Sequence, residues 1–309
     1  MWFKHHYPLE WWTATLNTTN DGKTSSAAEQ KLRFFMTLLS DVVKPPSLKK
    51  PSNKFQILDK SIVAPLSVLK QCGAKAVAEL ASKGPFTDIE DYIKRVNHSK
   101  VNIGVFSAAI KGRAIDDFLD TERPYKEARQ ELMDTYVKKR KCRDFTDEIK
   151  DTSPLNMFMM ERDTNKCFAK TLLNYPGIES ILSGYWPGLK KTGKIGIPFT
   201  LGNIPVLGGI GIAEKLLQKG VDKEVGMILL YESSKHKKIK SKKTGKEYDL
   251  VEVTLSDGFG PISCTIWGVE KALGWATNSL VYIKGTLQTG FKIPVSITAN
   301  EIDRIKETI

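Results

Sequence analysis

The sequence lacks the residue clusters on which several classes of protein depend. It has four cysteines, Cys72, Cys142, Cys167 and Cys264, which form no Cys-x-x-Cys pair and have no histidine at ligand spacing. Neither a zinc site nor a redox motif is therefore expected, and we interpret all four as ordinary thiols. No metal-binding residue is assigned.

Long apolar runs are missing as well. No stretch reaches the roughly 18 consecutive apolar residues from which a transmembrane helix is inferred. Lys4, His5 and His6 lie where a signal peptide would have its apolar stretch. We therefore expect a cytoplasmic protein.

Acidic residues are too few to balance the basic ones. Asp and Glu number 35 against 47 Lys and Arg, which gives a net charge of +12 over 309 residues. The hydrophobic content of 41% is that of a folded chain of two or three domains. So large a positive charge favours nucleic acid as a partner, ahead of an anionic membrane surface, and we assign no membrane partner.

The basic residues are densest in residues 235–246, where seven of twelve are lysine. Five strands are predicted around and after this run, with a helix over 269–275 between the third and the fourth; the strands cover 225–231, 249–255, 261–267, 280–287 and 295–302. This is the element count of an OB-fold barrel. Alternation places Ile262, Cys264 and Ile266 inside the barrel and Trp267 on the other face. The lysine run would then form the first connecting loop.

In OB-folds the first loop and the faces of strands two and three bind single-stranded nucleic acid through cations and aromatic platforms. The residues that we assign to this role are Lys235, Lys237, Lys238, Lys240, Lys242, Lys243, Lys246, Tyr248, Phe259 and Trp267. A solvated lysine hairpin is the alternative for the lysines. The aromatic residues could instead cover the end of the barrel.

The first half of the chain predicts an all-α region. Pro8 begins a helix, a second helix covers 27–43, and short helices with tight turns occupy 61–112. Thr87 and Glu90 form a predicted capping box, Gly112 ends a helix, and a longer helix covers 121–143. The predicted fold class is α+β and multidomain, with a helix-hairpin-helix region followed by a five-stranded OB-fold barrel.

Glycine turns that open helices are candidate phosphate sites. Free backbone N–H groups and the helix dipole both attract an anion at such a turn. Lys70, Gly73 and Lys75 form the first candidate, and Gly209 and Gly211 the second. A plain turn between two helices is the alternative reading of each.

Several segments, in this order, resemble C-family bacterial replicative DNA polymerases, the alpha subunit of DNA polymerase III. "WFKHHYPLEWWTATLN" (2–17) is similar to the end of the family's fingers, and "VVKPPSLKKPSNKF" (42–55) to its proline-rich connector. "PLSVLKQCGAKAVAEL" (65–80) and "VNIGVFSAAIKGRAIDDF" (101–118) resemble its two helix-hairpin-helix elements, and the barrel its OB domain. Gln71 stands where the family usually has a glycine, and Lys49 and Lys50 interrupt the connector.

The resemblance implies four segments. They are an end of fingers with a connector (1–60), tandem helix-hairpin-helix elements (61–143), a linker region with a glycine turn and helix (144–220) and the OB-fold domain (221–309). The family's palm would precede residue 1. Its carboxylates hold the two metal ions of nucleotidyl transfer, and no Asp-x-Asp cluster occurs here on a predicted strand. We therefore assign no catalytic residue, and Mg²⁺ would belong to the palm.

The resemblance also implies the partners. These are single-stranded and primer-template DNA, a polymerase chain bearing the palm and fingers, and a sliding clamp bound by Leu155, Met157 and Phe158 of "PLNMF". A place in the local core is the alternative for these three residues. The source would be a bacterium or a phage. A stand-alone single-stranded-DNA-binding accessory protein and an aminoacyl-tRNA synthetase fragment remain alternative functions.

Overall fold

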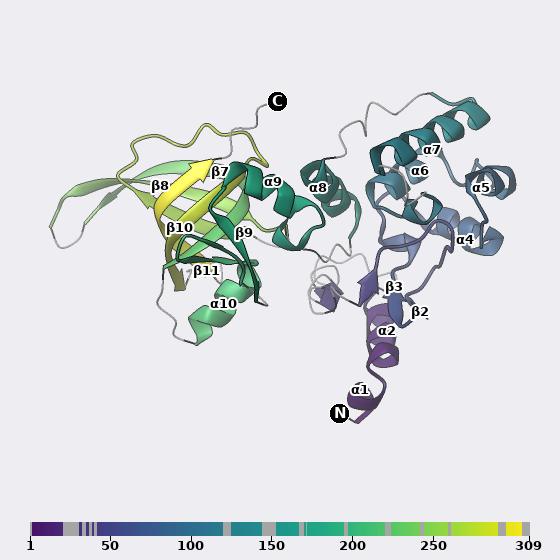
Figure 1. Ribbon diagram of the computed structural model, residues 1–309, viewed down its shortest axis with the longest axis horizontal. Helices are drawn as coiled ribbons and strands as arrows, with labels where there is room; N and C mark the ends of the chain where they lie inside the picture. The colour runs from purple at the N-terminus through teal and green to yellow at the C-terminus, as the bar shows by residue number, and fades with distance from the viewer. Residues whose placement is uncertain are drawn as a thin grey trace. The chain divides into compact units, whose positions relative to one another are not determined.

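The chain folds into two compact units, residues 1–169 and residues 170–309. The computed structural model (Figure 1) describes residues 2–20, 31–32, 35–36, 39, 42–119, 125–143, 153–166, 170, 172–194, 197–219, 224–241, 244–258, 261–289 and 295–304. The segment 144–220, predicted as a linker region, is divided between the two units.

The first unit is mainly helical, with a small ribbon of three short strands. Its elements are α1 (Trp2–His6), α2 (Pro8–Thr19), β1 (Val43–Lys44), β2 (Gln56–Leu58), β3 (Ser61–Val63), η1 (Leu66–Val68), α4 (Ala74–Lys83), α5 (Ile89–Arg95), α6 (Ile103–Lys111), η2 (Asp116–Phe118), α7 (Tyr125–Arg140) and α8 (Pro154–Thr164). The predicted helix starts at Pro8 and end at Gly112 are confirmed. The helix predicted over 27–43 lies mostly outside the described residues.

The capping box of α5 lies one residue later than predicted. Asp88, rather than Thr87, is the N-cap, and its Oδ1 accepts a hydrogen bond from the Asp91 N–H at 2.8 Å. The Asp91 side chain in turn binds the backbone before the helix, because its Oδ2 accepts a hydrogen bond from the Thr87 N–H at 3.1 Å. Asp91 at the third helical position supplies the reciprocal acceptor, so the predicted Glu90 is not needed.

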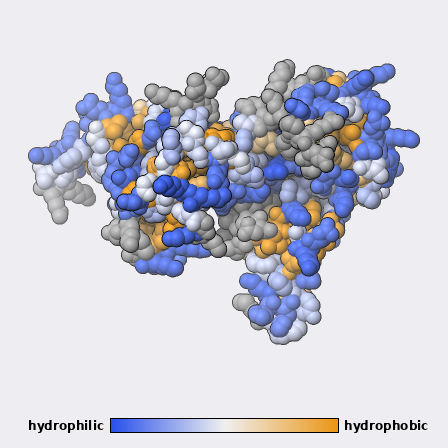
Figure 2. Space-filling view, in the orientation of Figure 1, coloured by the Kyte–Doolittle hydropathy of each residue, from blue (hydrophilic) through white to orange (hydrophobic). Residues whose placement is uncertain are grey.

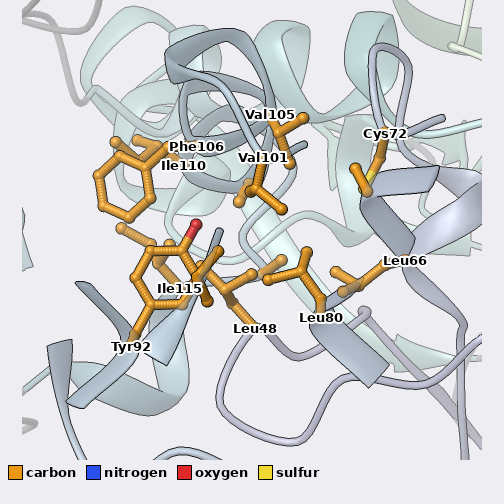
Figure 3. Packing of buried hydrophobic residues seen from close by; sticks show 14 of the residues in the cluster. Leu48, Leu66, Cys72, Leu80, Tyr92, Val101, Val105, Phe106, Ile110 and Ile115 are labelled. Atoms are coloured by element: carbon orange, nitrogen blue, oxygen red, sulfur yellow. The ribbon is translucent and has the colours of Figure 1, made fainter. Parts of the chain in front are cut away.

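Aromatic stacking forms the centre of the helical core (Figure 3). The rings of Phe106 on α6 and Tyr136 on α7 are nearly parallel at a centroid distance of 3.7 Å, and Tyr92 on α5 stacks on Phe106 at 5.8 Å. Leu80 of α4 and Leu48 of the connector lie in the same buried cluster. This shared core fixes the helices that carry both hairpin turns.

The second unit is a mixed sheet with three short helical segments. Its elements are η4 (Leu172–Asn174), α9 (Ile178–Tyr185), β4 (Leu189–Lys194), β5 (Ile197–Leu201), β6 (Ile204–Leu207), α10 (Ile210–Gln218), β7 (Glu224–Lys240), β8 (Glu247–Ser256), β9 (Pro261–Trp267), β10 (Leu280–Thr289) and β11 (Val295–Arg304). The strands lie in the order β10-β11-β9-β8-β7-β6-β5-β4, and β10 also pairs with β7.

The pairing of β10 with β7 closes a five-stranded barrel. The closed order is β7-β8-β9-β11-β10, with β9 and β11 parallel and the other pairs antiparallel. This is the OB-fold topology, and the five predicted strands are confirmed. A Cβ at Gly285 would overlap the carbonyl oxygen of Thr298, so glycine allows β10 and β11 to approach closely at the register shift beside Lys284.

The helix predicted over 269–275 is not formed. Tyr231 Oη and Ser234 Oγ both donate hydrogen bonds to the carbonyl oxygen of Leu273, at 2.8 and 2.9 Å, so that carbonyl is bound by side chains of β7. Instead α10, which precedes the first barrel strand, packs Ile210 and Ala213 against the barrel core. Their spacing matches one face of a helix.

The lysine run was predicted in a loop, and this is wrong for its first half. Lys235 to Lys240 belong to β7, where each residue has a partner on β8, from Lys235 opposite Glu252 to Lys240 opposite Glu247. We call the part of β7 and β8 that includes residues 235–240 and 247–252 the barrel arm. It projects from the barrel at the left of Figure 1. Extended pairing continues through the lysines because β8 offers a ladder partner to each of them.

The helix α10 begins against a buried carboxylate. Asp257, in the turn after β8, is 4% exposed, and its Oδ2 accepts a hydrogen bond from the Ile210 N–H at 2.8 Å. The carboxylate lies at the positive end of the helix dipole, where a negative charge is stabilising. Asp257 thereby attaches α10 to the barrel.

Replacing Asp257 by alanine should therefore destabilise the second unit. A buried hydrogen bond to a charged group contributes about 1.5–3 kcal/mol, so we expect a loss of this order in the free energy of unfolding. Urea unfolding followed by circular dichroism measures it. Glu270→Ala, which removes an exposed carboxylate of the same unit, is the matched control, and equal effects of the two changes would contradict the role of Asp257.

Candidate nucleic-acid interface

The first hairpin turn, between η1 and α4, presents its backbone to solvent. Gly73 is the N-cap of α4 and has no side chain to accept from the helix, and a Cβ placed there would meet no atom within 4 Å. Lys70 and Lys75 are exposed on either side. The predicted residues of this hairpin therefore lie together at an open helix N-terminus, an arrangement that attracts an anion.

Gln71 keeps the turn geometry despite replacing a glycine. Its φ is +70°, in the left-handed region that glycine adopts most easily, and holding a residue with a Cβ there costs about 1–3 kcal/mol. Its side chain lies against the start of α6, because a Cβ on Gly104 would come 2.8 Å from Gln71 Oε1. The substitution thus preserves the turn and adds a contact with the second hairpin.

Glu79 joins the two hairpins, and the sequence analysis did not identify it. This α4 residue is 7% exposed; its Oε1 accepts from the Asn97 N–H at 3.2 Å and its Oε2 from Lys100 Nζ at 3.0 Å. The hydrogen bond from Lys100 lowers the pKa of Glu79 below its ordinary value. Its position between the buried Val77 and Leu80 was the available signal, because a carboxylate on an apolar helix face needs a partner.

The residues predicted to bind a clamp lie in a helix and are buried. Ser153 caps α8, and Leu155, Met157 and Phe158 are all buried, with Phe158 0% exposed. The sulfur of Met157 accepts a hydrogen bond from Arg129 Nη1 at 3.0 Å. These contacts support the alternative of a local core, because little surface of the three residues is left for a partner.

The second glycine turn is closed to an outside phosphate. Gly209 is buried at the start of α10, and Gly211 lies within the helix. The Ile210 N–H is already bound by the Asp257 carboxylate, which would repel an incoming anion. These contacts argue against the assignment of Gly209 and Gly211 to DNA binding.

The lysines of the barrel arm differ in the charges beside them. Lys237 Nζ meets Glu252 Oε2 at 2.6 Å, and His236 Nε2 meets Asp249 Oδ1 at 2.8 Å. The other predicted lysines that the structure describes are exposed, with no carboxylate at ion-pair distance within the described part of the chain; they are Lys235, Lys238, Lys240 and Lys246. Lys242 and Lys243 lie outside the described residues. Figure 2 shows a mostly hydrophilic surface at this end of the arm.

Three large apolar side chains are nevertheless exposed on the arm and the adjoining strand. Ile239, Tyr248 and Trp267 are 42%, 44% and 52% exposed. Ile239 is directly opposite Tyr248, and the rings of Tyr248 and Trp267 meet edge to face at 6.5 Å. The exposed positions of Tyr248 and Trp267 agree with the sequence analysis, whereas Phe259 lies outside the described residues.

Register places these side chains on one face. Directly opposed residues of an antiparallel pair share a face, and so do residues two apart on a strand. Lys235 and Lys237 therefore share the face of Ile239, while Leu250 connects Tyr248 to Trp267, which is its partner on β9. We call Ile239, Tyr248 and Trp267 with Lys235 and Lys237 the outer strip.

The outer strip has the composition of a single-strand site. Flat aromatic rings can stack on bases whatever the sequence, and lysines next to them can contact phosphates. Sequence reasoning missed Ile239, although its spacing of two from Lys237 and its place opposite Tyr248 in the hairpin could have identified it.

The buried cysteines offer no reactive thiol, and the described residues offer no metal site. Burial raises the pKa of Cys72 and of Cys264 to about 12, so both are protonated thiols at neutral pH. Among the described residues, no three His, Cys, Asp or Glu lie close enough to hold a metal ion. Within the same part of the chain, no helix is long and apolar enough to cross a bilayer.

Comparisons with known proteins agree with the two hairpins. A family profile described as a helix-hairpin-helix motif matches residues 42–125. The DNA polymerase III subunit alpha of Thermus aquaticus is 29% identical over 124 residues, which are 39% of this chain and 10% of that protein. The same subunit of Campylobacter jejuni subsp. jejuni serotype O:2 is 28% identical over 126 residues, with 38% and 10% covered.

These matches confirm the resemblance to DNA polymerase III alpha subunits. The matched part spans 10% of the length of both relatives. Among solved structures, the second OB-fold domain of replication protein A from Methanococcus maripaludis is 16% identical, with 28% of this chain and 89% of that chain covered and a TM-score of 0.24. The OB-fold assignment of the barrel depends on its strand order and not on this likeness.

The ion pair of Glu79 predicts a pH-dependent stability of the first unit. Because its pKa is lowered from the ordinary 4.5, its contribution is fully present above that value and is lost as pH falls through the lower, folded pKa. Glu79→Gln should therefore lower the urea midpoint at pH 7, and the difference from the wild type should shrink at strongly acid pH.

The control for this experiment is Glu90→Gln. The Glu90 carboxylate meets Lys139 at 3.3 Å with both side chains exposed, and such pairs contribute little. If the difference in urea midpoint between the wild type and Glu79→Gln stays constant from neutral to acid pH, the ionised carboxylate is not the stabilising form.

Proposed function

We propose that this chain is the DNA-handling, C-terminal portion of a replicative polymerase of the DNA polymerase III alpha type. The observation that carries the DNA-handling role is the outer strip, which lies on the first three strands of an OB-fold barrel, and the similarity to DNA polymerase III alpha subunits supports the polymerase part. Single-stranded nucleic acid binds in this region of OB-folds. The similarity of residues 42–125 to helix-hairpin-helix motifs supports a role on DNA.

The outer strip would hold the unpaired template strand. Tyr248 and Trp267 would stack on bases, Ile239 would pack beside them, and Lys235 would neutralise phosphate. Stacking on an aromatic side chain contributes about 1–3 kcal/mol per base. Every base has a flat face, so binding by stacking requires no particular DNA sequence. A replicative enzyme must bind every template sequence, and stacking meets this requirement.

The first hairpin would hold the backbone of the primer-template duplex. The open N-terminus of α4 at Gly73, with Lys70 and Lys75 beside it, can bind a phosphate through backbone N–H groups and positive charge. Contacts of this kind fix the position of the DNA without reading its sequence. The Glu79 link to the second hairpin would keep the turn rigid.

A polymerase chain with the palm and fingers would be the protein partner. Trp2, Phe3 and Tyr7, in and beside the helices α1 and α2, are exposed, and large aromatic side chains gathered at one surface are typical of protein interfaces. The Mg²⁺ ions of nucleotidyl transfer would be bound by that partner. The structure offers no exposed residue from α8 for a sliding clamp among the three that the sequence indicated.

A stand-alone single-stranded-DNA-binding accessory protein is the second candidate function. The outer strip would serve it equally well, and the two candidates differ in the use of the helical unit. A polymerase portion should prefer a primer-template junction over a single strand of the same length, because both units then contribute. An accessory protein should prefer the single strand.

Aromatic substitutions test the outer strip. Tyr248→Ala and Trp267→Ala should each weaken binding to a mixed-sequence single-stranded oligonucleotide by about tenfold, since each removes one stacking platform of about 1–3 kcal/mol. Fluorescence anisotropy with a labelled oligonucleotide measures the affinity. Tyr185→Ala removes an exposed aromatic ring elsewhere in the same unit and is the control. Equal losses in all three variants, or none in any, would contradict the site.

Lysine substitutions test the first hairpin. Lys70→Ala with Lys75→Ala should reduce binding to a primer-template junction and leave binding to the single strand nearly unchanged. Lys54→Ala with Lys60→Ala removes two exposed lysines of the same unit away from the hairpin, and should leave the preference for the junction intact. If neither pair alters the preference, the helical unit does not contact the duplex.

A further inference from the structure

The second unit contains one five-residue sequence twice. Lys-Lys-Thr-Gly-Lys occupies residues 190–194 and again residues 242–246. The first copy forms the end of β4, just before the chain turns into the antiparallel β5. The second lies between β7 and β8, at the end of the barrel arm. We call these segments the β4–β5 tip and the arm tip.

The two copies share a local hydrogen bond. Thr192 Oγ1 accepts from the Lys194 N–H at 3.1 Å, and Thr244 Oγ1 accepts from the Lys246 N–H at 3.5 Å. A threonine that binds the backbone two residues onward fixes a tight turn. The backbones of the two copies differ, because residues 190–194 are strand with a register shift after Lys191, whereas Thr244 lies in a turn and Gly245 has a φ of +69°. The copies therefore share the threonine hydrogen bond and the flanking lysines.

Strand directions place both tips toward the same end of the sheet. β4 is antiparallel to β5, β5 is antiparallel to β6, and β6 is parallel to β7. β4 and β7 therefore run in the same direction; the β4–β5 tip forms the C-terminal part of β4, and the arm tip follows the C-terminal end of β7. Through the pairs Lys191–Phe199, Phe199–Val206 and Val206–Gly226, the end of β4 lies level with the barrel part of β7.

The register also gives the separation of the tips. Lys194 pairs with Ile197, two residues before Phe199, and so lies level with about Ile228, whereas β7 continues to Lys240. Twelve residues of strand at about 3.3 Å each make roughly 40 Å. The outer strip lies on the stretch of β7 between these two levels. One tip thus stands near the barrel and the other beyond the strip.

The lysines of the β4–β5 tip are available to an external anion. Lys191 Nζ is paired with Glu179 Oε2 at 2.7 Å. Lys190 and Lys194 are exposed, and no carboxylate of the described residues lies at ion-pair distance from them. Like charges held in one turn repel one another, and a bound phosphate relieves that repulsion.

We infer that the β4–β5 tip is a second contact for the phosphate backbone of single-stranded nucleic acid. The inference rests on the proposed function, because the strand that lies on the outer strip is the one that reaches this tip. A long strand touches both tips and a short one touches the strip and arm alone. The two copies of Lys-Lys-Thr-Gly-Lys thereby extend the footprint of the barrel at both ends.

The experiment compares oligonucleotides of increasing length. We expect Lys190→Ala with Lys194→Ala to leave the affinity for a short oligonucleotide, of about 8 nucleotides, unchanged, and to weaken binding to one of about 24 nucleotides. OB-fold sites range over about 4–16 nucleotides, which sets these lengths. With the long strand, the slope of log affinity against log salt should fall by about 1.4, at about 0.7 for each of two phosphates on single strands.

Salt then gives a direct readout of the lost contacts. Between 50 and 200 mM salt, a slope difference of about 1.4 changes the ratio of wild-type to variant affinity by about sevenfold. Lys190→Arg with Lys194→Arg, which keeps both charges, should restore wild-type behaviour. Lys215→Ala with Lys219→Ala removes two exposed lysines, one in α10 and one at its C-cap. It is the control for net charge, and its effect should not depend on oligonucleotide length.

The possible failures are distinguishable. If the tip variant matches the wild type at every length while Tyr248→Ala weakens binding, the second contact is refuted and the outer strip remains. If the α10 control loses as much affinity as the tip variant, the effect is one of net charge and the inference fails. If the wild type binds no single-stranded DNA, the proposed function itself fails.

Discussion

The strand β7 changes partners along its length, from β10 and β6 in its first half to β8 in its second, and the second unit depends on this division. Residues 224–230 pair with β10 and close the barrel, whereas residues 230–240 pair with β8. Because the pairing with β8 continues beyond Leu230, where the pairing with β10 ends, the two strands form the barrel arm. The arm holds Ile239 and Tyr248 opposite each other and away from the buried interior of the barrel. A shorter β7 would leave the same lysines in a loop, with no rigid face for Trp267 to join.

Backbone N–H groups at helix starts decide which glycine turns are open to a ligand. Gly73 and Gly209 both open helices, and their sequences look alike in this respect. Asp257 is buried at the start of α10 and binds the Ile210 N–H, so that helix start is part of the fold. At the start of α4 the space is empty and lysines stand on either side. The difference comes from Asp257, which lies 48 positions after Gly209 in the sequence. A sequence pattern local to Gly209 does not include it.

Local pattern was sufficient for the strands of the barrel and for most helix starts, because alternation and capping are short-range signals. It failed where tertiary pairing overrides local preference. The lysines of β7 were expected in a loop, yet β8 pairs with them; residues 269–275 were expected to be helical, yet side chains of β7 bind the Leu273 carbonyl. Within the site, Tyr248 and Trp267 could be chosen as aromatic residues, whereas Ile239 is recognised through its cross-strand partner. Glu79 required knowledge that Asn97 and Lys100 fold back onto α4.

The central claim is that single-stranded DNA lies across the outer strip. Photo-cross-linking of an oligonucleotide containing 5-iododeoxyuridine, followed by mass spectrometry of the linked peptides, tests it directly, because the reaction favours aromatic side chains in contact with the base. We predict cross-links at Tyr248 and Trp267, competed away by unlabelled single-stranded DNA. Cross-links confined to residues 2–12, or to Tyr185, would place the strand elsewhere and contradict the account.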